Sequence, residues 1–105
     1  MLALTLALAL AAPSHMRERD IWVDCLMSYA QIESAGMKTP ASIAVDAMTA
    51  CGPERAAYMK ALIRQPQATA SRSNSAVAQA AVRMESDQKA VVRNVIAFVL
   101  RSRHD

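Results

Sequence analysis

Alanine constrains this chain more than any other residue, since it occupies 22 of 105 positions whereas glycine occupies only two. Alanine is the strongest helix former, and glycine is favoured in the tight turns that join strands. The composition therefore predicts an all-α fold, and the length allows one small domain. Two glycines cannot form a glycine-rich phosphate-binding loop, and two cysteines with two histidines are too few for a zinc finger or an iron–sulfur cluster.

An uncharged apolar segment, LALTLALALAA, occupies residues 2–12. As a helix it would span roughly half of the ~30 Å hydrocarbon core of a membrane, so it is too short to cross one. Its length suits the apolar core of a secretory signal peptide, although the first basic side chain, Arg17, follows the segment instead of preceding it. The alternative is a buried N-terminal helix. We expect a signal peptide over residues 1–14, a single domain over residues 15–105, and a periplasmic or secreted protein.

Four helices are predicted for the rest of the chain. They cover residues 16–35, 40–51, 54–64 and 75–103, and a polar loop covers residues 65–75. Thr39 is suited to cap the second helix and Pro40 to occupy its first position, where no hydrogen bond is lost. Gly36 can end the first helix in a left-handed conformation. The expected architecture is a small bundle of three to four helices with a long C-terminal helix.

The first and last helices each carry an apolar stripe. In the first, apolar and aromatic side chains recur at three- and four-residue spacing: Trp22, Cys25, Leu26, Tyr29 and Ile32. The last helix would be about 40 Å long, more than a short helix can cover, so we expect a partner protein, a second copy or the rest of the chain to cover its stripe. Gln88 falls inside that stripe and is either a buried amide with partners or a weak point of the packing. The predicted interaction face consists of Val77, Met84, Val91, Val95, Phe98 and Val99.

Charge is distributed unevenly along the chain, with a net −2 over residues 13–52 and +5 over residues 53–105. Arg83, Arg93 and Arg101 lie largely opposite the apolar stripe and form the predicted basic surface. This surface is either a solvated helix face or a peripheral contact with an anionic membrane surface. Nucleic acid is not an expected partner, because the basic residues are dispersed and aromatic residues are scarce.

Cys25 and Cys51 fall on the inner faces of the first and second predicted helices. An exported protein with two cysteines is expected to join them, and antiparallel helices bring such positions together. The bridge would close a loop of about 26 residues and stabilise the fold by roughly 3 kcal/mol. The alternative is a redox-active dithiol, for which a C-x-x-C spacing would be the usual sign.

The segments IWVDCLMSYA and TPASIAVDAMTACGPERAAYMKALI carry a resemblance over about residues 21–64. They resemble a loose group of small secreted bacterial proteins of unknown function, in which a Trp-x-x-Cys helix precedes an alanine-rich helix that ends in cysteine. The matching positions are Trp22, Cys25, Ile43, Ala44, Ala47, Cys51, Glu54, Ala56 and Ala57. The resemblance implies a periplasmic helical protein with one disulfide and implies no activity. The chain is also similar, more weakly, to small periplasmic acid-stress chaperones.

No catalytic or metal-binding constellation is predicted. A hydrolytic triad needs a histidine between a nucleophile and a carboxylate, but His15 and His104 lie near the two ends of the chain. Two pairs of carboxylates are expected to be solvated: Asp20 with Asp24, and Glu85 with Asp87. We expect no cofactor and no enzymatic activity.

The sequence thus favours a non-enzymatic exported protein of the cell envelope that acts by interaction. Its expected partner is an unidentified envelope protein or a second copy of the chain. The alternative is a chaperone-like protein that is activated by acid and binds unfolded clients.

Overall fold

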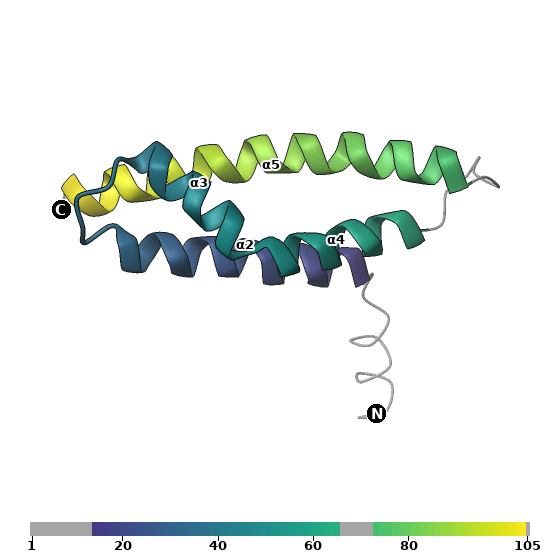
Figure 1. The fold of residues 1–105 in the computed structure, drawn as a ribbon, viewed down its shortest axis with the longest axis horizontal. Coiled ribbons are helices and arrows are strands. Elements are labelled where there is room, and N and C mark those ends of the chain that lie inside the picture. The colour runs from purple at the N-terminus through teal and green to yellow at the C-terminus, as the bar shows by residue number, and fades with distance from the viewer. Residues whose placement is uncertain (1–13, 66–72, 105) are drawn as a thin grey trace, which may run out of the picture.

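The computed structural model describes residues 14–65 and 73–104, and in this part of the chain four helices and no strand are present (Figure 1). The helices are α2 (Ser14–Glu33), α3 (Pro40–Ala50), α4 (Gly52–Arg64) and α5 (Ser73–His104). The predicted all-α class, the number of helices and the long last helix are confirmed. The predicted signal peptide lies outside the described residues except for Ser14, which begins α2, and most of the predicted polar loop also lies outside them.

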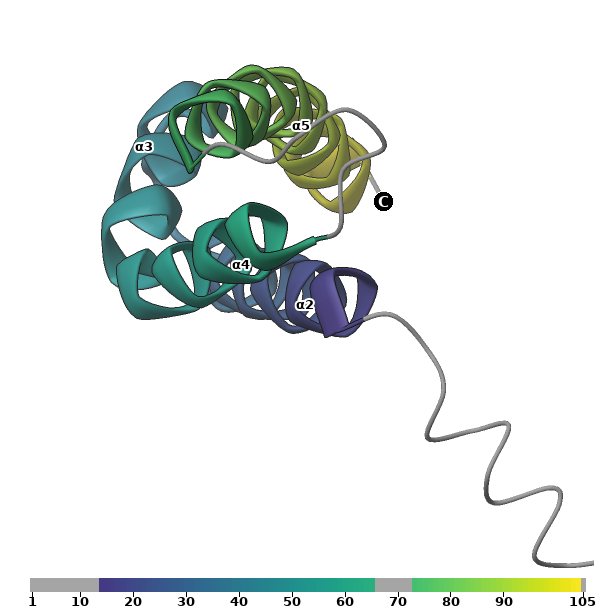
Figure 2. The same ribbon diagram turned by 90° about the vertical axis from the view of Figure 1, so that its right-hand side faces the viewer.

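The four helices form a three-membered bundle. Helices α2 and α5 run in the same direction, and α3 and α4 return in the opposite direction, one after the other (Figure 1). Both α3 and α4 contact α2 and α5, and α2 also contacts α5, so the two short helices together act as the third member of the bundle (Figure 2). The chain bends between α3 and α4, where Gly52 and Pro53 begin the second of these helices.

This arrangement explains how the long helix is covered. Helix α5 has 32 residues, or about 48 Å at 1.5 Å per residue. Helices α3 and α4 have 11 and 13 residues, follow one another along the chain and both contact α5, so together they cover more of it than either could alone. Of the three expected ways to cover the stripe, the described structure uses the chain itself.

The start of α3 follows the predicted cap. The Thr39 side-chain oxygen accepts a hydrogen bond from the Ser42 backbone N–H at 3.1 Å, and Pro40 stands in the first turn. The end of α2 does not follow the prediction, because Gly36 has no positive φ. Instead the helix stops at Glu33, and the Gly36 N–H donates a hydrogen bond to the Glu33 carbonyl at 3.0 Å.

The core lies between the three members of the bundle and draws on all four helices. The rings of Trp22 and Tyr58 stack within it, with centroids 5.7 Å apart and planes 28° apart. Ile32, predicted to face inward, is 76 % exposed because six residues of helix place it about 120° from Leu26. The core residues are Trp22, Leu26, Ala30, Ile43, Ala44, Ala47, Cys51, Tyr58, Leu62, Ala80, Met84, Val91, Val95 and Val99.

The inward stripe of α5 differs from the predicted one near its start. Ala76 and Ala80 are buried, whereas Val77 is 45 % exposed. Helix α4 ends beside this segment, since Leu62 lines the same hollow as Ala80, and Val77 is not among the residues that line it. From Met84 onward the inward positions follow the prediction.

Candidate functional site

The predicted interaction face is for the most part the core of the protein itself. Met84, Val91, Val95 and Val99 are between 0 % and 3 % exposed and belong to the main core cluster. Phe98 is partly buried and packs against that cluster, and Val77 alone of the six is exposed. In the described conformation this stripe therefore offers no large apolar surface to a partner.

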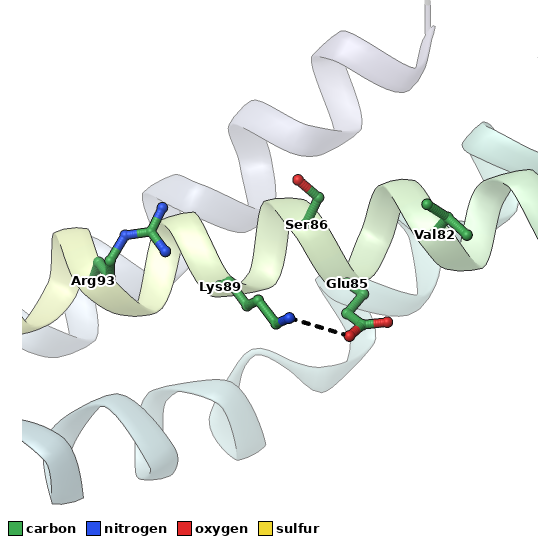
Figure 3. Close-up of a pocket in the computed structure, with 5 residues that line it drawn as sticks. All are labelled: Val82, Glu85, Ser86, Lys89 and Arg93. Atoms are coloured by element: carbon green, nitrogen blue, oxygen red, sulfur yellow. Dashed lines mark ion pairs between the residues drawn. The ribbon is translucent and has the colours of Figure 1, made fainter.

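The opposite side of α5 is open. Val82 and Leu100 are 70 % and 53 % exposed. A shallow hollow on this side is lined by Val82, Glu85, Ser86, Lys89 and Arg93, all of which belong to α5 (Figure 3). The Lys89 ammonium lies 3.3 Å from the Glu85 carboxylate, which pairs two of the charges on this helix face. We call Val82, Ser86, Lys89, Arg93 and Leu100 the outward face of α5.

The three arginines of the predicted basic surface differ in their surroundings. Arg93 and Arg101 are exposed. The Arg83 guanidinium lies 3.3 Å from the Asp87 carboxylate, so its charge is paired within the protein. The basic surface is therefore weaker at Arg83 than the sequence indicates.

Asp87 is the centre of a polar cluster that joins three helices. Its carboxylate accepts a hydrogen bond from the Tyr58 hydroxyl of α4 and another from Arg83 Nε at 3.3 Å. Arg19 Nε of α2 lies 3.7 Å from the same oxygen. The side chain is only 15 % exposed, so the prediction that it is solvated is wrong. The sequence did hold one sign of this contact: Tyr58 was predicted to face inward, and a buried tyrosine hydroxyl needs a hydrogen-bond partner.

The environment of Tyr58 raises the pKa of its hydroxyl to about 12. Burial is the main cause, since it penalises the charged phenolate. The hydrogen bond to Asp87 and the negative charge of that carboxylate raise the pKa further, while Arg83 and Arg19 oppose the shift. The hydroxyl thus remains a donor at every physiological pH.

Gln88 has a partner inside the bundle. Arg55 Nε of α4 donates a hydrogen bond to Gln88 Oε1 at 2.9 Å in a partly buried position. Of the two predicted possibilities, a buried amide with partners is the one observed. This contact lies beside the Asp87 cluster and adds a second polar link between α4 and α5.

A further set of polar contacts lies at the end of the bundle where α2 and α5 both end. The Arg103 guanidinium of α5 donates hydrogen bonds to the backbone carbonyls of Ser34 at 3.1 Å and Gly36 at 3.0 Å. Nearby in the sequence, Lys38 Nζ lies 3.0 Å from Asp46 and 3.9 Å from Glu33. The hydrogen bond to Asp46 is the main cause of the raised pKa of Lys38.

The predicted disulfide is present. Cys25 and Cys51 are joined, with Cα atoms 6.0 Å apart. Cys51 was expected to be the last residue of the second helix, but it stands between α3 and α4 and is the residue that precedes the first turn of α4. The bridge therefore fixes α2 to the bend between α3 and α4. Glu54, in the first turn of α4, has a carboxylate oxygen within 4.8 Å of both sulfur atoms.

The histidines do not contribute to a shared site. His15 lies in the first turn of α2 and His104 at the last residue of α5, and these ends are at opposite extremes of the bundle (Figure 1). Asp20 and Asp24 are exposed, as predicted. Among the described residues, the one group of three side chains with metal-ligating atoms close together consists of Cys25, Cys51 and Glu54.

No family model matches the chain. No curated protein and no solved structure matches it either. Within the described part of the chain, no helix has the length and apolar character needed to span a membrane.

Proposed function

We propose that this chain is a non-enzymatic, exported protein of the bacterial envelope that acts by binding another envelope protein. The observation that carries the proposal is the Cys25–Cys51 disulfide, which joins α2 to the junction of α3 and α4 in a chain with an uncharged apolar segment over residues 2–12. Disulfides of this kind persist in the periplasm and outside the cell, whereas cytosolic thiols are kept reduced. The resemblance of residues 21–64 to small secreted two-cysteine proteins points the same way.

The binding surface that we propose is the outward face of α5. It combines two exposed aliphatic side chains, Val82 and Leu100, with the exposed cation Arg93 and with Lys89, whose ammonium is paired with Glu85. Such a surface fits a partner that presents an apolar patch beside acidic groups. The predicted interaction face of α5 is mostly buried in the core, whereas the outward face is already exposed. A partner can therefore bind the outward face without displacing any helix.

Export is tested by expressing the full chain in a Gram-negative host and measuring the intact mass of the protein from the periplasmic fraction. We expect loss of the N-terminal segment at a site between Ala11 and Ser14, and no free thiol in the mature protein. Recovery of the uncleaved chain from the cytoplasm, with two alkylatable thiols, would refute the proposal.

Binding is tested with Val82→Asp, which places a charge on the outward face without disturbing the core. Ser28→Asp is the matched control, since Ser28 is exposed on α2. We expect Val82→Asp to abolish co-purification of one periplasmic partner at an unchanged melting temperature, while Ser28→Asp retains it. If the partner is a second copy, light scattering of the wild type shows a dimer that Val82→Asp dissociates. Equal behaviour of both variants would exclude this face.

The Asp87 cluster supports a second candidate function, an acid-activated chaperone. The Asp87 carboxylate accepts a hydrogen bond from the Tyr58 hydroxyl and lies close to arginines of α2 and α5. Protonation of this one carboxylate would remove the negative charge from all three contacts at once. The N-terminal half of α5 would then be held mainly by Ala76, Ala80 and Met84. Two of these three side chains are small, so loss of the cluster should open this half before the half that carries Val91, Val95 and Val99.

The chaperone function is tested with Asp87→Asn, which imitates the protonated side chain at neutral pH. Glu85→Gln is the control, because Glu85 is 70 % exposed and its partner Lys89 lies on the same helix. We expect the wild type to bind a hydrophobic dye and suppress aggregation of an unfolded client near pH 3 only, and Asp87→Asn to do so at neutral pH. A wild-type protein that stays closed in acid, or opens without protecting the client, would eliminate this candidate.

A further inference from the structure

We propose that the Cys25–Cys51 bridge is a reversible exchange site for external thiols, at which Cys25 forms the mixed disulfide and the Glu54 carboxylate accepts and returns the proton of Cys51. The proposal rests on the surroundings of the bridge and not on the binding function above. It adds a covalent modification site for thiols, such as glutathione or an exposed cysteine of another protein. The bridge itself is the reactant, so the site requires no catalytic turnover.

The first observation is the position of Glu54 beside the two sulfur atoms. Sγ of Cys25, Sγ of Cys51 and a carboxylate oxygen of Glu54 lie within 4.8 Å of one another. Oε1 of Glu54 is buried and has no hydrogen-bond partner among the described residues. A buried acceptor without a donor is unfavourable, and its presence in a folded protein calls for a physical reason.

The oxidation state of the bridge provides that reason. Disulfide sulfur atoms carry no hydrogen, so the oxidised protein offers Glu54 no S–H donor. Reduction creates two thiols within reach of the carboxylate, and either one can donate to it after a small movement. The carboxylate therefore stabilises the reduced protein relative to the oxidised one, which favours opening of the bridge.

The second observation is that the two sulfur-bearing residues differ in accessibility. Cys25 is partly exposed on α2, whereas Cys51 is 0 % exposed and belongs to the core cluster. An external thiolate can therefore approach Cys25, and Cys51 is shielded behind it. This asymmetry assigns Cys25 as the attacked residue and Cys51 as the residue that leaves and later closes the bridge again.

The exchange balances without any further reactant. The thiolate attacks Cys25 Sγ, the new S–S bond forms, and the bond to Cys51 breaks with its electron pair remaining on Cys51 Sγ. The external thiol gives up one proton when it forms its thiolate, and Cys51 takes up one proton through the Glu54 carboxyl group and becomes a thiol. In the return step Glu54 accepts the Cys51 proton, the Cys51 thiolate attacks Cys25 Sγ, and the external thiolate is expelled and takes up that proton.

The packing around the bridge keeps the cysteines adjacent when the bond is open. Trp22, one turn before Cys25, stacks on Tyr58, one turn after Glu54. Both rings are 0 % exposed, so they hold α2 against α4 without the covalent bond. A reduced protein in which this stack persists presents Cys51 to Cys25 for closure.

The experiment measures closure of the reduced protein by oxidised glutathione at one neutral pH. Trp22 is the only tryptophan, so its fluorescence reports the state of the neighbouring bridge. We compare the wild type with Glu54→Gln, which keeps the size of the side chain but accepts no proton, and with Asp24→Asn. Asp24 is exposed and adjacent to Cys25, so it controls for loss of one nearby negative charge.

We expect Glu54→Gln to slow closure about 100-fold, the lower end of the usual contribution of a general base, at an unchanged helical circular dichroism spectrum. Asp24→Asn should close at the wild-type rate. Equal rates for wild type and Glu54→Gln would overturn the role of Glu54. Loss of the helical spectrum in the reduced wild type would overturn the whole proposal, because a bridge whose opening unfolds the protein is purely structural.

Single-cysteine variants test the assignment of the two sulfur atoms. Cys51→Ser should take up one glutathionyl group at Cys25 in the folded state, as seen by intact mass. Cys25→Ser should remain unmodified until denaturant exposes Cys51. Modification of both variants at the same rate would contradict the assignment.

Discussion

The Trp22 ring stacks on the Tyr58 ring with centroids 5.7 Å apart, and the Tyr58 hydroxyl donates a hydrogen bond to the Asp87 carboxylate. Tyr58 of α4 thus contacts α2 through an aromatic stack and α5 through a hydrogen bond. Tyr58 is 0 % exposed, so its hydroxyl depends on Asp87 for a hydrogen bond. Tyr58 therefore links its own helix, α4, to both α2 and α5.

Removal of the Tyr58 hydroxyl should destabilise the protein by about 1.5–3 kcal/mol, the usual effect of losing a hydrogen bond to a charged group. Tyr58→Phe keeps the stacked ring, so the change isolates the contact with Asp87. Tyr29→Phe is the same deletion on α2 and should have less than half this effect. Urea denaturation followed by circular dichroism measures both, and an equal loss for the two variants would contradict the prediction.

The raised pKa of Tyr58 predicts a loss of stability in alkali. Between the ordinary value of 10.0 and the folded value of about 12, the unfolded chain loses the phenolic proton while the folded protein keeps it. The unfolded state therefore binds fewer protons, and the free energy of unfolding decreases as the pH rises through this interval. Melting temperatures at pH 9, 10 and 11 should decrease more steeply for the wild type than for Tyr58→Phe. Parallel curves would show that Tyr58 does not titrate in this way.

Reduction of the disulfide should lower the stability by roughly 3 kcal/mol according to the chain-entropy relation for a 26-residue separation. For a domain of this size the melting temperature would decrease on the order of 10–20 °C. The measurement is a thermal scan with and without a phosphine reductant, and the Cys25→Ser, Cys51→Ser double variant should match the reduced wild type. An unchanged melting temperature would mean that the bridge contributes no stability.

The local patterns of the sequence predicted the helices and much of the core, because each depends on neighbours within one or two turns. Thr39 with Pro40 marked the start of α3, and the spacing of Trp22 and Leu26 marked the inward face of α2. The pairing of Cys25 with Cys51 followed from their number and from the expected compartment. These features require no knowledge of which helices are neighbours.

The features that sequence reasoning missed depend on how the helices are placed relative to one another. Asp87 was expected to be solvated because basic residues surround it in the sequence, but its partners Arg19 and Tyr58 come from two other helices. Arg103 donates a hydrogen bond to the backbone carbonyl of Ser34, 69 residues away in the sequence, and no local pattern indicates this contact. Coverage of the long helix was equally non-local, because it required both α3 and α4 to contact α5.

Val95→Asp distinguishes a core stripe from an interface. Val95 is 2 % exposed within the chain, so a buried carboxylate there should unfold the protein instead of dissociating a dimer. We expect loss of cooperative melting and of the helical spectrum. Val82→Asp, on the outward face of α5, should keep the wild-type melting temperature within about 2 °C, since surface substitutions have small effects. A folded, monomeric Val95→Asp protein would show that the stripe is not essential to the core.

Arg103 links the end of α5 to the end of α2, and its loss should loosen that end of the bundle without unfolding the rest. Arg103→Ala leaves the Ser34 and Gly36 carbonyls to water, which can solvate them because both contacts are exposed. The expected loss of global stability is therefore small, under about 1 kcal/mol. Hydrogen exchange should report the change more clearly: the amides of Ser34 and Gly36 should exchange faster, while those around Trp22 keep their protection. Arg101→Ala, an exposed arginine one half-turn earlier, is the control and should leave both regions unchanged. Faster exchange throughout α2 in Arg103→Ala would mean that the helix end and the core unfold as one unit.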